Sequence, residues 1–242
     1  MDLFVGGAVV ALASALGGAT GFGYGLVATP LLVLSGFSLP FVVTANLALG
    51  LITRIAAARR LRDHITWLRA TMLVAGSIPG LYLGARTLTG LDPRPIKIAI
   101  GVLVMTLAVL LVRASATAAP RPVPGAVLGA GFAGGFLGTV ASLNGVAPAL
   151  LLTRDRVPPV ALVADLAAYF VISNAIGLGI LAATGGLSTR ALFPACALWI
   201  PGAVACNLVG VALAPRVPER QFRRLTLAVV FVAGAVTIAT SY

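Results

Sequence analysis

Residues 17–25 read GGATGFGYG and are followed by Pro30, inside a segment that is otherwise apolar. A similar interruption, GGFLGTVASLNG, occupies residues 134–145 and is followed by Pro148, about half a chain further on. Interrupted apolar segments at matching places in two halves of a chain are typical of the binding sites of secondary transporters. Irregular backbone persists at membrane depth only where protein or a water-filled cavity covers its N–H and C=O groups.

The composition around these two breaks is that of an integral membrane protein. The 242 residues are 60% hydrophobic and only 10% charged, with a mean hydropathy of +1.07, whereas soluble domains are about 45–50% apolar and about 25% charged. The net charge of +11 comes mainly from arginines in short loops, as the positive-inside rule produces, so we expect no nucleic-acid partner. The sequence shows no metal-ligand spacing, Walker motif or Ser/His/Asp set, so we expect no metal, no cofactor and no enzyme activity.

The order of the apolar segments predicts an all-α membrane protein made of two repeats, 1–113 and 125–242, joined by a linker at 114–124. Matching elements recur in the same order in both halves, among them Ile78-Pro79-Gly80 and Ile200-Pro201-Gly202. Each repeat is expected to hold one broken or re-entrant helical hairpin and three transmembrane helices. The predicted hairpins are 3–34 and 125–152, and the predicted helices are 41–58, 68–85, 96–112, 159–183, 191–213 and 222–241.

The loop charges favour a re-entrant second hairpin. If 125–152 enters and returns on one side, most loop arginines gather on that side, and the other side keeps Arg86, Arg94, Lys97 and Arg190. Three crossings in each half, an odd number, would then invert the second repeat relative to the first, as is common in secondary transporters.

Stretch 17–25, running into Ala28-Thr29-Pro30-Leu31-Leu32, resembles the opening of the TauE/SafE family of sulfite and organosulfonate exporters. The second break and the Ile-Pro-Gly elements are similar too, and the likeness covers essentially the whole chain. The resemblance implies a duplicated multi-pass transporter, in a plasma membrane of the bacterial inner-membrane type. It also implies a small sulfur-containing anion as substrate, moved with proton coupling.

The two breaks supply the first candidate substrate-binding residues. A helix that starts after a break presents free N–H groups and a positive dipole end, which bind anions without a basic side chain. The alternative is that the glycines only allow close helix packing. The candidates are Thr20, Gly21, Gly23, Tyr24, Gly25 and Thr29 at the first break and Gly138, Thr139, Ser142, Asn144 and Gly145 at the second.

Polar residues inside the apolar segments supply three more candidates. Asp165 is the sole acid in an apolar span, which suits either a proton carrier or a polar residue near the interface. Asn46 holds the corresponding place in the first half, so the two would flank a central site where Asn46 donates to an anion. Arg54 could clamp an oxyanion. Its closeness to Arg59 and Arg60 instead favours an extended side chain that reaches the membrane surface.

These features together predict a secondary transporter of a small anion: sulfite, a sulfonate or a related sulfur oxyanion. We expect alternating access around the two breaks, with proton coupling, and partners limited to the anionic substrate and the lipid bilayer. An anion channel and a non-catalytic membrane assembly subunit are the alternatives that the sequence leaves open.

Overall fold

The computed structural model describes residues 2–90, 106, 125–187 and 192–213, and the regular structure in these residues is entirely helical. The all-α prediction is therefore confirmed for this part of the chain. The predicted helices 96–112 and 222–241 and the linker 114–124 lie outside the described residues, apart from position 106. The helices are α1 (Leu3–Thr20), α2 (Tyr24–Leu34), α3 (Leu39–Arg60), the 3-10 turn η1 (Arg62–His64), α4 (Trp67–Gly90), α6 (Ala126–Ala141), α7 (Val146–Arg154), α8 (Pro159–Ala183) and α9 (Leu192–Leu213).

Four described helices, α1, α3, α8 and α9, are long and apolar enough to cross a membrane. They hold 18 to 25 residues, which at about 1.5 Å per residue matches a hydrocarbon core about 30 Å thick. The 18-residue α1 is longer than the short arm that a re-entrant hairpin over 3–34 predicts, because the chain stays helical until Gly21. The division into two repeats is not tested by these helices and stays a prediction.

Each Gly-rich stretch forms a short break between two helices. The first break spans Gly21 to Gly23, where Gly21 has a φ of 83°, a left-handed conformation that glycine adopts without strain. The Thr20 hydroxyl oxygen accepts hydrogen bonds from the N–H groups of Phe22 at 3.3 Å and Gly23 at 2.7 Å. The N–H groups of Phe22 and Gly23 are therefore satisfied within the break itself.

The second break spans Ser142 to Gly145. Ser142 ends α6 with a φ of 58°, a left-handed conformation that costs a residue other than glycine about 1–2 kcal/mol. Its N–H donates to Gly138 at 3.0 Å, and the N–H of Leu143 donates to Leu137 at 3.1 Å. These bonds satisfy carbonyls at the end of α6 and hold the strained turn in place.

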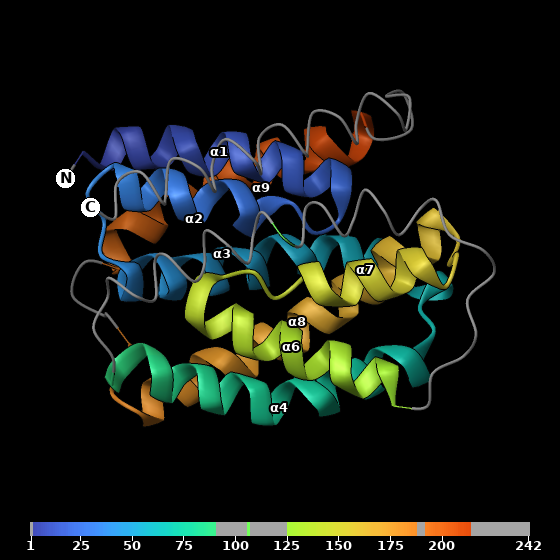
Figure 1. Ribbon diagram of the computed structural model, residues 1–242. Coiled ribbons are helices and arrows are strands. Elements are labelled where there is room, and N and C mark those ends of the chain that lie inside the picture. Colours follow the sequence, from blue (N-terminus) through green and yellow to red (C-terminus); the bar gives the residue numbers. More distant parts are fainter. Residues whose placement is uncertain (1, 91–105, 107–124, 188–191, 214–242) are drawn as a thin grey trace.

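The helices run side by side, with α1 against α9, α6 against α4, and α3 and α8 between these pairs (Figure 1). Glycines make the two outer contacts close, as small residues do between membrane helices. A Cβ atom on any of them would collide with backbone of the facing helix or, at Gly84, also with the Thr139 side chain. They are Gly76, Gly80 and Gly84 on α4, Gly131 and Gly135 on α6, Gly18 on α1 and Gly210 on α9.

Candidate functional site

A cavity of about 30 Å³ lies where the two breaks meet. The breaks touch directly, since a Cβ on Gly25 would collide with the carbonyl oxygen of Ser142. A volume of this size holds about two water molecules. The lining residues come from both breaks and from α3, α8 and α9: Phe22, Tyr24, Gly25, Asn46, Leu47, Gly50, Thr53, Arg54, Ser142, Asn144, Phe170, Asn174 and Asn207.

Arg54 is the charged residue of this lining. Only 4% of it is exposed, and its guanidinium lies 5.5 Å from the centre of the Phe170 ring. Its Nη2 donates to the carbonyl of Gly17 at 2.8 Å, whereas its Nη1 has no hydrogen-bond partner. The ion pairs found among the described residues involve other arginines. Buried charges in proteins are normally paired, so this arrangement favours an anionic ligand.

The expected surface orientation of Arg54 is wrong. The side chain points into the bundle, where the carbonyl of Gly17 and the ring of Phe170 hold it. Arg54 lies six residues before the end of α3 at Arg60, about 9 Å along the helix axis. Arg59 and Arg60 are exposed as the sequence suggests. The position of Arg54 along α3 does not reveal which hydrogen-bond acceptor on a neighbouring helix its side chain reaches.

Hydrogen bonds connect the polar lining to both breaks. The Tyr24 hydroxyl donates to the side-chain oxygen of Asn46 at 2.9 Å, and the Asn46 amide donates to the Thr29 hydroxyl at 3.1 Å. Thr29 in turn donates to the carbonyl of Ala141 at 3.0 Å, at the end of α6. This chain of bonds fixes the first break against the second and orients the Asn46 amide beside the cavity.

The second break has its own polar contacts. The Asn144 amide donates to the side-chain oxygen of Asn174 at 2.6 Å, and the buried Ser142 hydroxyl has no hydrogen-bond partner. An unpaired buried hydroxyl costs about 1–3 kcal/mol. Together with the free Nη1 of Arg54, it leaves two unused hydrogen-bonding groups on the cavity wall.

Six of the candidates from the sequence line this cavity: Tyr24, Gly25, Asn46, Arg54, Ser142 and Asn144. The other candidates at the breaks shape the turns or the helix contacts without lining the cavity. They are Thr20, Gly21, Gly23, Thr29, Gly138, Thr139 and Gly145. Thr139 shows the difference, because its hydroxyl donates to the carbonyl of Leu81 on α4 at 3.2 Å.

The other lining residues were not candidates from the sequence. They are Phe22, Leu47, Gly50, Thr53, Phe170, Asn174 and Asn207. The sequence does contain a signal for two of these residues. Asn174 and Asn207 are amides inside apolar segments, the same property that singled out Asn46. The aromatic residues and Thr53 carried no such signal, since these types are common in membrane helices.

Asp165 does not reach the cavity, so the expected central pair with Asn46 is not formed. Its carboxylate is fully buried, accepts from the N–H of Thr66 at 2.6 Å and lies 3.3 Å from Nε of Arg69. Thr66 and Arg69 flank the start of α4. Asp165 therefore ties the start of α4 to α8, which fits the interfacial interpretation better than that of a proton carrier.

Asp165→Asn is expected to lower stability and to leave the pH dependence of transport unchanged. The amide keeps one acceptor for Thr66 but loses the attraction to Arg69 and introduces an unpaired buried donor, at a cost of about 1–3 kcal/mol. Thermal unfolding in detergent and flux at several pH values measure the two effects. The exposed Asp63, changed to Asn, is the matched control. A loss of pH dependence at full stability would instead make Asp165 a proton carrier.

No group of three or more His, Cys, Asp or Glu residues that could hold a metal ion occurs within the described ranges. The cavity wall includes amides, hydroxyls, aromatic rings and one guanidinium. Such a wall can bind a small anion through hydrogen bonds and charge.

Comparison with protein families gives a match over most of the chain. The model of the family described as sulfite exporter TauE/SafE matches residues 6–237, which is nearly the whole chain. Searches of curated proteins and of solved structures gave no significant match.

Proposed function

This chain belongs to the TauE/SafE sulfite exporter family, and from that premise we propose that it is a secondary transporter of a small sulfur oxyanion, with sulfite as the leading substrate. The cavity between the two breaks is the proposed binding site. One observation carries the proposal: the guanidinium of Arg54 is buried against this cavity with an unused donor and no carboxylate partner among the described residues.

The chemistry of the wall suits a trigonal oxyanion. A guanidinium presents a planar fork of donors that matches the oxygens of such an anion. The Ser142 hydroxyl and the Asn46 and Asn174 amides offer further contacts around the same space. Phe170 covers one face of Arg54, which keeps water away and strengthens the attraction to the anion. An anion of four heavy atoms is larger than the cavity, so its entry requires the lining side chains to move apart.

Alternating access would operate at the contact between the breaks. We propose that 3–34 and 125–152 are hairpins of two inverted repeats, which enter from opposite sides and meet at the cavity. The packing of α1 on α9 and of α6 on α4 supports this, because each hairpin rests on a helix from the other half of the chain. Breaking the hydrogen bond between the Thr29 hydroxyl and the carbonyl of Ala141 would open the cavity to one side. A multi-pass location in a plasma membrane of the bacterial inner-membrane type belongs to the same proposal.

Proton coupling, in this proposal, operates through the substrate. No carboxylate belongs to the lining of the cavity in the described residues, whereas sulfite is itself a weak base that carries a proton when it binds as hydrogensulfite. Transport should then follow an imposed pH gradient without any acidic side chain in the site.

Sulfite flux into proteoliposomes tests the proposed function. A carrier that alternates between two sides is expected to show counterflow, in which unlabelled internal sulfite accelerates entry of labelled sulfite. A channel shows no such acceleration. Flux no greater than in empty liposomes for sulfite, thiosulfate and small sulfonates would overturn the proposal and leave the assembly-subunit alternative.

A further inference from the structure

A second, larger cavity lies on the surface where α3 ends. This groove has a volume of about 500 Å³ and shares no lining residue with the central cavity. Its walls come from the end of α3, the turn that follows, the start of α4 and one face of α8. The lining residues are Ala58, Arg59, Arg62, Ile65, Trp67, Ala168, Val171 and Ile172.

The wall of the groove that α8 forms is apolar, and the side formed by the end of α3 and the following turn is positively charged. Ala168, Val171 and Ile172 follow the i, i+3, i+4 spacing that places side chains on one helix face, and α8 is one of the candidate membrane spans. Arg59 lies at the end of α3, another candidate span, and Arg62 lies in the turn η1 that follows it. Both arginines are exposed. The groove therefore joins an apolar surface on a candidate membrane span to a positively charged surface at the end of another.

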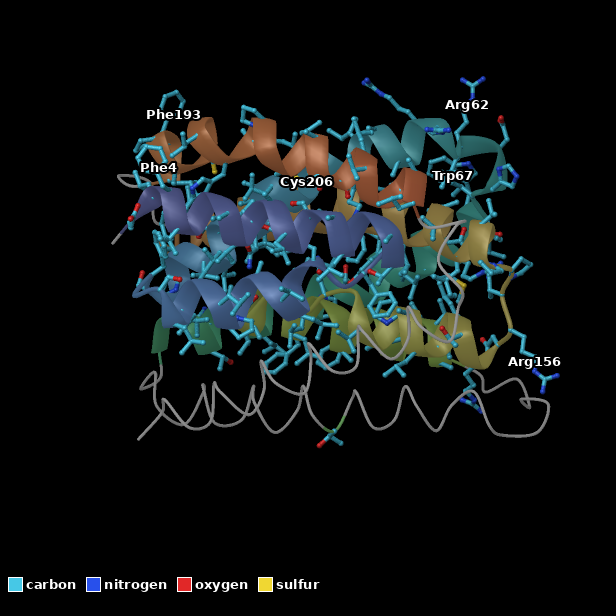
Figure 2. The ribbon with its side chains drawn as sticks, turned by 90° about the horizontal axis from the view of Figure 1, so that it is seen from above. Phe4, Arg62, Trp67, Arg156, Phe193 and Cys206 are labelled. Atoms are coloured by element: carbon cyan, nitrogen blue, oxygen red, sulfur yellow. The ribbon has the colours of Figure 1, made fainter. Side chains whose placement is uncertain are left out.

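Trp67 marks the level of the membrane interface at this groove. It is 56% exposed, and Figure 2 shows it at the same edge of the molecule as Arg62. Tryptophan is enriched where the hydrocarbon core meets the head groups. Its position beside the two arginines places their charges at the level of lipid phosphates.

The arginines are available for an external anion. Arg62 lies 3.5 Å from Asp63, but the side chains are 77% and 82% exposed, and such pairs contribute little. No ion pair of Arg59 occurs among the described residues. The segment 59–69 holds Arg59, Arg60, Arg62 and Arg69 against a single acid, Asp63.

We propose that this groove binds one anionic phospholipid of the surrounding bilayer. The phosphate lies between Arg59 and Arg62, the glycerol lies beside Trp67, and an acyl chain follows the apolar face of α8. Charge complementarity and the apolar wall select this occupant, because inorganic phosphate would leave the wall uncovered and a neutral lipid would leave the charges unpaired. The lipid would join α3 to α8, the helices that carry Arg54 and Asn174.

Thermal unfolding of the purified chain in detergent tests this site. Phosphatidylglycerol is expected to raise the unfolding temperature more than phosphatidylcholine with the same acyl chains. Arg59→Gln and Arg62→Gln should each weaken phosphatidylglycerol binding about fivefold, since each basic residue near a lipid surface contributes about 1 kcal/mol. Native mass spectrometry measures the bound lipid directly. Arg60→Gln is the matched control, because Arg60 is exposed on the same helix end but does not line the groove.

Three results would overturn the proposal. Equal stabilisation by the two lipids would show that charge is not recognised, and an equal loss in the Arg60→Gln control would show only general surface attraction. A shift of the same size with inorganic phosphate would show an anion site without lipid. Arg62→Gln keeps the test valid if Arg59→Gln folds poorly, because the exposed Arg62 side chain supports no buried contact. Sulfite flux is a separate readout, so loss of lipid binding does not depend on the transport proposal.

Discussion

Arg54→Gln is expected to weaken sulfite transport strongly while leaving the protein folded. The change removes the charge that faces the cavity and the free Nη1 donor. A hydrogen bond to a charged group contributes about 1.5–3 kcal/mol, so the loss of sulfite affinity should reach about 100-fold. Sulfite flux in proteoliposomes, measured over a range of concentrations, gives the size of the effect.

The stability of this variant separates a binding role from a structural one. The variant loses the hydrogen bond to Gly17 but also the cost of burying a charge without a counter-charge, so the unfolding temperature without sulfite should stay level or rise. Arg54→Lys keeps the charge but loses the planar fork and should retain partial transport with weaker affinity. Arg60→Gln, on the exposed end of the same helix, is the control for expression. Normal flux in Arg54→Gln, or its failure to fold, would contradict the assignment.

Gly80→Val is expected to prevent stable folding. A Cβ at Gly80 would collide with the carbonyl oxygen of Phe132 and lie 2.8 Å from the backbone nitrogen of Phe136. Both are backbone atoms of α6, so only separation of the two helices relieves the clash. Overpacking commonly costs about 1–3 kcal/mol, and this position should reach or exceed the upper end. Yield of monodisperse protein and its unfolding temperature measure the loss.

Two other helical glycines are matched controls for the contact between α4 and α6. A Cβ at Gly129 on α6 or Gly179 on α8 would meet no atom within 4 Å. Alanine there should be neutral or raise stability by up to about 1 kcal/mol, since it favours the helix. If Gly80→Val is as stable as these controls, α4 and α6 do not pack as closely as described.

The places where the chain breaks could be predicted from local sequence. Gly21 and Gly23 stand between apolar runs, and Ser142 to Gly145 interrupts the second run, so both turns were visible as clusters of residues that favour breaks. Candidate residues next to these turns, such as Tyr24 and Asn144, do line the cavity. This part of the site depends on the backbone preferences of neighbouring residues, which can be read from the sequence.

The direction of single polar side chains could not be predicted. Arg54 turns inward because Gly17, 37 positions away, offers a carbonyl, and Asp165 turns away because Thr66, 99 positions away, offers an N–H. Asn207 joins the cavity only because α9 packs along α1 and α3. These outcomes depend on tertiary packing, and nothing in the spacing of the residues encodes them.

The glycines illustrate the same limit. Packing and break formation were alternatives for the Gly-rich stretches, and both occur within a few residues. Gly18 lies against the backbone of Asn207 on α9, whereas Gly21 adopts the left-handed turn. Composition does not separate these two roles of glycine, because the packing role depends on whether another helix lies against the residue.

The central claim is that the cavity between the two breaks binds a small oxyanion on Arg54. Selenite has the shape and charge of sulfite, and its selenium can be located by anomalous X-ray scattering in crystals of the protein. We expect an anomalous peak inside the cavity, with oxygens within hydrogen-bond distance of Nη1 of Arg54 and of the Ser142 hydroxyl. A peak elsewhere in the protein, with Nη1 of Arg54 still unpartnered, would contradict it.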